Sequence, residues 1–260
     1  MSMTPALETK NLVKRFGGLL ATGDVTMALP QGARHALIGP NGAGKTTFVN
    51  LLSGALTPTS GAVSLNGAEI THWPMHRRAR AGLSRTFQIN RLFADFSPLE
   101  TIALVLCEQR HEGAQFWRRL ATKTDLLDEA YDVLDGLGLG ALALHTVRTL
   151  PYGQQRLLEI ATAIASRPKV LLLDEPAAGV PEGERDQILD AVDRLPREMT
   201  IVLIEHDMDL VFRFARTISV LVNGKLFVEG SAAEVASDPR VKKVYLGEGF
   251  DETSVSAANG

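Results

Sequence analysis

The sequence Gly-Pro-Asn-Gly-Ala-Gly-Lys-Thr at residues 39–46 fits the pattern GxxxxGK[ST] of a phosphate-binding loop. The apolar run at residues 34–38 precedes it and a helical stretch follows it, which is the order of elements that such a loop requires. Its glycines let backbone amides close around a phosphate, and the helix N-terminus adds the positive end of its dipole. An ordinary glycine-rich turn is the alternative, but the pattern is complete and correctly placed. We therefore predict a nucleotide site formed by Gly39, Pro40, Asn41, Gly42, Ala43, Gly44, Lys45, Thr46 and Thr47.

Two side chains of this loop and two carboxylates far along the chain predict the chemistry. Lys45 would reach the β- and γ-phosphates of a nucleotide, and the Thr46 hydroxyl would ligate Mg²⁺. A second apolar run at residues 170–173 ends in Asp174 and Glu175, at the end of a strand where ligands bind in parallel sheets. We expect Asp174 to hold Mg²⁺ through water and Glu175 to act as the general base. Such a pair alone would usually be a solvated strand end, whereas its combination with the loop favours catalysis.

The rest of the chain predicts an α/β fold around this loop. Its 260 residues are 45% apolar and 22% charged, which suits a large buried core and excludes a disordered chain. Near-continuous apolar runs alternate with longer amphipathic stretches, as in a parallel sheet covered by helices. The expected buried strands are residues 34–38, 170–173, 200–204 and 218–222.

Local signals add an antiparallel flank and a helical insertion to this core. Asn-Gly dipeptides at residues 66–67 and 223–224 predict two-residue hairpin turns. Capping boxes predict helix starts at Ser97 and at Ser231. Between about residues 89 and 149 leucine-rich helical stretches replace the strand signal, so we predict a mostly helical subdomain there.

Charge and cysteine content exclude several classes of protein. The net charge is -3, which gives no broad basic surface for a nucleic acid. Cys107 is the single cysteine, so we expect no internal disulfide, a reducing compartment and a small buried side chain at that position. The local basic cluster of Arg77, Arg78 and Arg80 is interpreted as a solvated helix face.

The motifs in this order resemble the ATP-binding cassette (ABC) ATPase family, from Leu7 to about Gly247. In that family a glutamine that senses the γ-phosphate begins the helical insertion, and Gln88 in Arg-Thr-Phe-Gln is its counterpart with a catalytic and metal-binding role. The resemblance also assigns Phe16 to adenine stacking and His206 to the γ-phosphate as the switch histidine. The counterparts of the family's signature motif are Leu150, Pro151, Tyr152, Gly153 and Gln154.

This resemblance implies an assembly as well as a fold. The expected fold is a P-loop NTPase core with a flanking antiparallel β-subdomain and an inserted helical subdomain. The family uses its signature motif on the partner's nucleotide, which implies a dimer with two molecules of ATP, each with Mg²⁺. The implied divisions are a first part of the ATP-binding core, a helical subdomain, the signature helix with the second part of the core, and a flexible tail, at residues 1–88, 89–149, 150–248 and 249–260.

Finer motifs are similar to one branch, the ATPase subunits of branched-chain amino acid importers. The matching segments are Phe16-Gly17-Gly18-Leu19, residues 85–88, Arg91-Leu92-Phe93, residues 152–156, 176–179 and 244–248. The branch implies two membrane permease subunits, a sister ATPase or a second copy of this chain, and an external substrate-binding protein that acts indirectly. It implies a peripheral location on the cytoplasmic face of the inner membrane and no nucleic-acid partner. By analogy, residues 89–100 would receive a helix of the membrane subunit, with Phe93 and Phe96 as anchors.

Two departures from the family pattern and several alternatives remain open at this point. Pro151 replaces the signature serine and removes a hydroxyl and a backbone N–H, and Pro181 stands where the family usually has an aspartate. These departures give the hypothesis of weaker or partner-controlled hydrolysis. Alternative functions are a related transporter of urea, other amino acids, aromatic acids or lipopolysaccharide, a soluble ABC ATPase acting on nucleic acid or ribosomes, and a regulator that hardly hydrolyses ATP.

Overall fold

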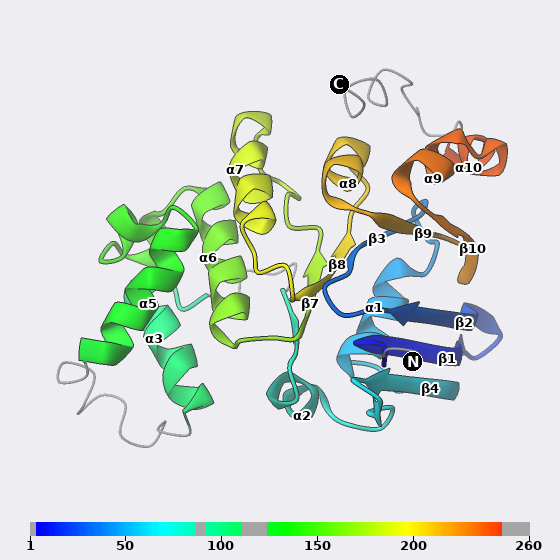
Figure 1. Ribbon diagram of the computed structural model, residues 1–260, viewed down its shortest axis with the longest axis horizontal. Helices are drawn as coiled ribbons and strands as arrows, with labels where there is room; N and C mark the ends of the chain where they lie inside the picture. Colours follow the sequence, from blue (N-terminus) through cyan, green and yellow to red (C-terminus); the bar gives the residue numbers. More distant parts are fainter. Residues whose placement is uncertain (1–3, 87–91, 111–123, 246–260) are drawn as a thin grey trace.

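The computed structural model describes residues 4–86, 92–110 and 124–245 (Figure 1). Its strands are β1 (Leu7–Phe16), β2 (Leu19–Leu29), β3 (Arg34–Ile38), β4 (Ser60–Leu65), β5 (Ala68–Glu69), β6 (Leu83–Arg85), β7 (Val170–Asp174), β8 (Thr200–Ile204), β9 (Thr217–Val222) and β10 (Lys225–Gly230). Its α-helices are α1 (Lys45–Ser53), α2 (Met75–Arg80), α3 (Pro98–Gln109), α5 (Thr124–Gly136), α6 (Tyr152–Ala165), α7 (Glu182–Asp193), α8 (Met208–Phe214), α9 (Ala232–Ser237) and α10 (Pro239–Tyr245). Short 3₁₀ turns are η3 (Gly140–Leu142) and η4 (Val147–Thr149). No helix within these described ranges has the length and apolarity needed to cross a membrane.

The described strands form two sheets. The six-stranded sheet has the order β10-β9-β3-β8-β7-β6, in which only β10 runs antiparallel to its neighbour. The four-stranded sheet has the order β2-β1-β4-β5, and all of its pairings are antiparallel. The parallel strands bring the carboxyl ends of β3, β7 and β8 to one end of the sheet, where ligands bind in α/β proteins. The predicted α/β core with an antiparallel flank is confirmed.

Alternate residues of the parallel strands face two separate cores, so these strands are buried on both sides. Leu37 and Val202 pack with α1 and the antiparallel sheet, which places α1 between the two sheets. Ile38 and Leu203 face the helices on the opposite side of the parallel sheet. Phe48 of α1 is completely buried, and burying a side chain of this kind contributes about 1.5–3 kcal/mol. This double burial explains why the strands appear as unbroken apolar runs in the sequence.

The local signals form the structures that the sequence predicts. Both Asn-Gly pairs connect antiparallel strands, and Asn66 and Asn223 have φ values of 49° and 49° that the type I′ turn requires. Ser97 and Ser231 each accept a hydrogen bond from a backbone amide in a complete capping box. The predicted strand at residues 170–173 extends by one residue to include Asp174.

Helices α3 and α5 form the helical part of the molecule and pack together with α6 (Figure 1). Their apolar faces join the core on the helical side of the parallel sheet, so this part is continuous with the main body. Cys107 is buried on α3, as expected. The proposed boundary at residue 88 and the tail from residue 249 lie outside the described residues.

The prediction that the arginine cluster on α2 is a solvated helix face is wrong for Arg78. Arg78 is only 1% exposed, whereas Arg77 and Arg80 are exposed. Its guanidinium donates to the carbonyls of Leu51 and Leu52 at 2.7 and 2.6 Å, and also to those of Thr71 and Trp73. Arg78 therefore caps the C-terminus of α1, whose last carbonyls have no partner within the helix.

Candidate functional site

The phosphate loop connects β3 to α1 in the structure, as its sequence predicts. Gly44 is the N-cap of α1 and has φ of 97°, a left-handed conformation that favours glycine. A Cβ at this position would lie 2.4 Å from the carbonyl oxygen of Ala21, so a larger residue cannot fit. The Lys45 ammonium donates to the carbonyls of Gly39 and Pro40 at 2.5 and 3.1 Å, and it therefore lies inside the curve of the loop. Amides, a helix N-terminus and an ammonium converge there, which is a site for a phosphate chain.

Asp174 and Glu175 follow one another at the carboxyl end of β7, but their environments differ. Asp174 is buried, and its Oδ2 accepts a hydrogen bond from Arg85 at 2.5 Å. The Asp174 amide donates to the Thr86 hydroxyl at 3.2 Å, so the start of the segment after β6 also holds this strand end. Glu175 is half-buried and has φ of 48°, which is uncommon for a residue other than glycine. The two carboxylates therefore have the separate environments that separate roles require.

Arg85 is a site residue that the sequence reasoning did not identify. It lies at the end of β6, next to β7 in the sheet. Its guanidinium contacts Asp174 with one nitrogen and the Asn50 side chain of α1 with another, at 2.6 Å. Since Asn50 lies one turn after Thr46 on the same helix face, Arg85 places Asp174 beside the face that carries the Thr46 hydroxyl. The signal that would have found it is the cation at the end of one strand beside an acid at the end of the next.

His206 follows β8 and lies near Glu175 because β7 and β8 are adjacent parallel strands. Its Nδ1 is 3.9 Å from Glu175 Oε1, and its side chain is 64% exposed. The carboxylate between these two strand ends belongs to Glu205, which is 1% exposed. Burial raises the pKa of Glu205, and hydrogen bonds from the amides of His206 and Ala177 partly oppose this effect. The strand ends thus bring together the predicted base, the predicted switch histidine and a buried carboxylate.

The sequence model of the family described as "ABC transporter" matches residues 22–178. That segment contains the phosphate loop, Arg85 and the two carboxylates, and it covers more than half of the chain. The chain belongs to the ABC transporter family. A second model, described as "Branched-chain amino acid ATP-binding cassette transporter", matches residues 225–251 of this cassette.

Proteins similar to this ABC cassette include subunits named for amino-acid transport. The high-affinity branched-chain amino acid transport ATP-binding protein BraF of Pseudomonas aeruginosa is 39% identical over 94% of this chain and 98% of its own length. LivG of Escherichia coli K12, with the same description, is 38% identical over 94% of this chain and 98% of its own length. The alignments therefore extend over nearly the whole of both chains.

Two crystal structures of an ABC transporter's ATP-binding cassette have the same fold. One is an ADP conformation and the other is nucleotide-free, and each has a TM-score of 0.81 and 30% identity to this chain. The ADP conformation is covered over 99% of its length and matches 94% of this chain. The predicted fold class, including the antiparallel and helical parts, is thus confirmed.

The residues that the resemblance assigns to the signature motif lie at the start of α6. Pro151 is the N-cap and Tyr152 the first helical residue, while Leu150 is buried just before them. Gly153 is buried, and a Cβ there would lie 2.3 Å from Glu184 Oε2 of α7, so a larger residue would displace the end of the Glu184 side chain. The side-chain oxygen of Gln154 is buried and has no hydrogen-bond partner among the residues that the structure describes.

Phe16 and Gln88 are the remaining predicted nucleotide contacts. Phe16 ends β1 with its ring 47% exposed, and the Lys14 ammonium lies 5.1 Å from the ring centre. An exposed aromatic face of this kind is suited to stacking on a purine. Gln88 lies outside the described residues, so its assigned role stays a prediction.

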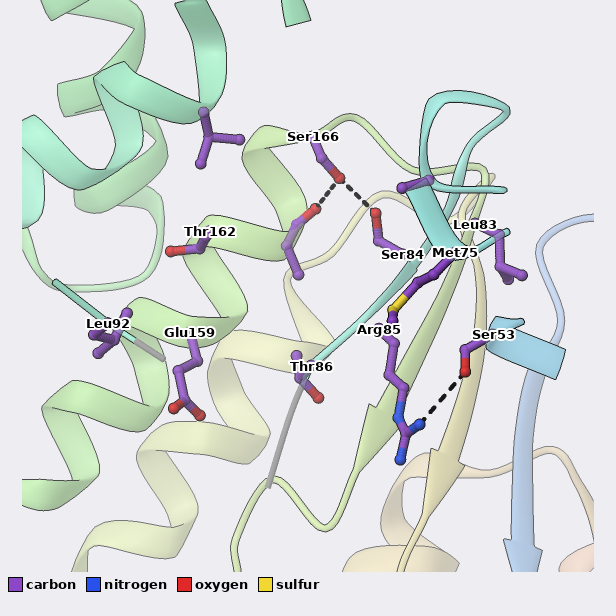
Figure 2. Close-up of a pocket in the computed structure, with 13 residues that line it drawn as sticks. Ser53, Met75, Leu83, Ser84, Arg85, Thr86, Leu92, Glu159, Thr162 and Ser166 are labelled. Atoms are coloured by element: carbon purple, nitrogen blue, oxygen red, sulfur yellow. Dashed lines mark hydrogen bonds between the residues drawn. The ribbon is translucent and has the colours of Figure 1, made fainter. Parts of the chain in front are cut away.

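A pocket of about 300 Å³ opens between the ATP-binding core and the helical part (Figure 2). It lies beside Arg85, and its lining comes from α2, β6, α3 and α6. Leu92 lines it, whereas Phe93 is exposed nearby and stacks on Phe96 with ring centres 4.9 Å apart. The lining includes the charged side chains of Arg85 and Glu159, and Leu92 belongs to the segment that the resemblance assigns to contact with a membrane subunit.

Proposed function

We propose that this chain is the ATP-binding and ATP-hydrolysing subunit of a membrane importer of branched-chain amino acids. The observation that carries this proposal is the convergence of the phosphate loop, Asp174, Glu175 and His206 at one end of the parallel sheet. The 39% identity to a branched-chain amino acid transport ATP-binding protein, over almost the full chain, supports the transport function and the cargo. The family match at residues 225–251 supports the same branch.

The oxygen donors at the site fit Mg²⁺, which accompanies ATP as its cofactor. Thr46 is exposed at the start of α1, and Arg85 holds Asp174 beside that helix. A hydroxyl and a carboxylate are ligands that Mg²⁺ prefers, and the resemblance adds Gln88. When bound, Mg²⁺ would neutralise charge on the β- and γ-phosphates.

The protein side chains supply positioning and proton transfer for hydrolysis. Lys45 and the loop amides hold the phosphates, and His206 donates a hydrogen bond to the γ-phosphate. Glu175 accepts a proton from the attacking water while the water oxygen forms a bond to the γ-phosphorus. The bond from that phosphorus to the bridging oxygen breaks, and ADP and phosphate leave. Phe16 stacks on the adenine.

The proposed assembly has two of these cassettes and two permease subunits. Leu150, Tyr152, Gly153 and Gln154 act on the ATP of the opposite cassette, which is either a sister subunit or a second copy of this chain. The groove beside Arg85 receives a helix of a permease subunit on the cytoplasmic face of the inner membrane, with Phe93 and Phe96 as apolar anchors. An external binding protein delivers the amino acid. Closing the cassettes switches the permease by rigid-body motion.

Affinity purification from gently solubilised native membranes tests this assembly. A tagged chain should recover polytopic membrane subunits and a second ATP-binding subunit, identified by mass spectrometry. Recovery of soluble or ribosomal proteins alone would refute the transporter function. A Lys45→Ala chain is the matched control for nucleotide dependence, because it keeps the fold but loses the ammonium that faces the phosphates.

Uptake by cells tests the cargo. Deletion of the gene should abolish energy-dependent uptake of labelled leucine, isoleucine and valine, and the wild-type chain should restore it. Restored uptake of urea or aromatic acids with unchanged leucine uptake would contradict the cargo while keeping the transporter.

A further inference from the structure

Glu205 is a buried carboxylate whose place in the site the proposed mechanism leaves unexplained. It lies directly after β8, between Ile204 and His206, and its side chain is 1% exposed. A carboxylate in such a position is unfavourable unless hydrogen bonds compensate for its lost hydration. An apolar side chain would fill the same volume without this penalty. Its partners should therefore indicate what the carboxylate does.

The two oxygens of Glu205 connect two different loops of the site. Oε1 accepts a hydrogen bond from the Ala177 amide at 3.3 Å, in the turn that follows Glu175. Oε2 accepts from the His206 amide at 3.1 Å. One side chain thus links the loop after β7 to the loop after β8.

Backbone hydrogen bonds also hold the turn that carries Glu175. The Glu175 amide donates to the carbonyl of Ile204 at 2.9 Å, and the Ala178 amide donates to the Glu175 carbonyl at 3.1 Å. Glu175 has φ of 48°, a conformation that a residue other than glycine adopts only when its surroundings hold it there. The bond from Ala177 to Glu205 anchors the turn two residues beyond this point.

The charged groups around Glu205 form a small set. The His206 ring faces it with Nδ1 3.7 Å from Oε2, and the same nitrogen is 3.9 Å from Glu175 Oε1. On the α7 side, Arg185 pairs with Asp207 at 3.2 Å. The imidazole therefore lies between the carboxylates of Glu175 and Glu205, so the placement of either carboxylate affects where the ring lies.

We propose that Glu205 is a positioning residue that fixes Glu175 and His206 relative to each other for ATP hydrolysis. This inference rests on the proposed function, because that function assigns Glu175 as the base and His206 as the switch histidine. Because the Glu205 side chain is only 1% exposed, it acts through the residues that it binds. Through its hydrogen bonds to the His206 and Ala177 amides, it couples the backbone position of His206 to that of the turn after Glu175. Nucleotide affinity, which depends on the phosphate loop, does not depend on it.

The test is a comparison of ATP turnover and ATP affinity in full-length variants. Glu205→Gln keeps the volume but has a single acceptor oxygen, so it loses one of the two links, and Glu205→Ala loses both. We expect kcat to fall at least tenfold in Glu205→Gln and further in Glu205→Ala. The Kd for a fluorescent ATP analogue should change less than threefold in both variants.

Ile201→Val is the matched control, because Ile201 is buried earlier in the same strand and its hydrocarbon side chain cannot hydrogen-bond to either loop. It removes one buried methyl group, which lowers the Tm slightly, and should keep kcat within twofold. A Glu205→Gln chain with kcat within twofold of wild type would refute the proposal. So would a fall in kcat that Ile201→Val reproduces at the same loss of thermal stability.

Two further variants separate this inference from the proposed function. If Glu175→Gln keeps wild-type turnover, the assignment of the base is wrong, whatever Glu205 does. If Glu175→Gln is inactive and both Glu205 variants are active, only the positioning role is refuted. In a His206→Ala chain, Glu205→Gln should still lower kcat at least twofold, because the backbone amides of residues 177 and 206 still bind Glu205 and hold the turn of Glu175. No further loss would contradict the positioning of Glu175 by Glu205.

Discussion

Replacement of Arg78 by methionine is expected to destabilise the cassette by about 3 kcal/mol. The guanidinium donates four hydrogen bonds to buried carbonyls at 2.6–3.0 Å. At about 1.5 kcal/mol for each carbonyl left without a donor, the loss is about 6 kcal/mol. Burial lowers the pKa of Arg78 to about 10, which corresponds to a desolvation penalty of about 3 kcal/mol that the substitution relieves. The difference of about 3 kcal/mol favours the wild-type arginine.

The assay is thermal unfolding followed by circular dichroism, with ATP binding measured on the same samples. For a chain of this size a loss of about 3 kcal/mol lowers Tm by about 6–12 °C. Arg80→Met is the matched control, because Arg80 is exposed on the same helix and pairs with exposed Glu108. That surface pair contributes about 0–1 kcal/mol, so the control should lower Tm by less than about 4 °C. Equal Tm values for the two variants would refute the reasoning that Arg78 caps α1.

Four further outcomes are expected. Glu175→Gln should bind ATP, hydrolyse it at least about a hundredfold more slowly and accumulate a closed dimer by gel filtration, and wild-type turnover would exclude Glu175 as the base. Arg85→Met should cost about 3–5 kcal/mol in urea unfolding because it leaves Asp174 buried and unpaired, and a loss below 1 kcal/mol would contradict that pairing. Burial lowers the pKa of His35 to about 4, so the neutral imidazole stabilises the fold above about pH 6.5. As the pH falls from about 6.5 towards 4, the free energy of unfolding should decrease by up to about 1.4 kcal/mol per pH unit. A His35→Phe chain should show a weaker dependence of its unfolding free energy on pH in this range. Pro151→Ser should raise turnover in the assembled transporter, and an unchanged rate would remove the basis for a weakened signature.

Local patterns in the sequence were sufficient for the core strands, the hairpin turns and the helix starts. A capping box such as that at Ser97 needs only four residues, and the amide and hydroxyl that it pairs are close in any helix. The phosphate loop is equally local. The order of these motifs then assigned Asp174, Glu175 and His206 to one end of the sheet, because parallel strands share that end.

Contacts between distant segments could not be predicted in the same way. Three arginines on a short helix look alike in the sequence, and only the position of α1 behind α2 makes Arg78 a buried cap. Likewise Arg85 is one residue of a motif, and its role depends on the pairing of β6 with β7. The sequence shows only that Glu205 precedes the predicted switch histidine. Its burial and its bonds to the amides of Ala177 and His206 depend on how the loops after β7 and β8 pack, which the sequence does not give.

The position of β6 has a consequence for how the chain folds. This strand has three residues and is an edge strand of the parallel sheet, where it pairs with β7. In the sequence, the helical insertion and α6 lie between β6 and β7. The entropy lost on closing a loop increases with its length, and a three-residue strand regains little of it. We therefore expect β6 to join the sheet after β3, β7 and β8 have paired. Because Arg85 arrives with β6, the partner of Asp174 is acquired in the last stage of folding and is lost in the first local opening.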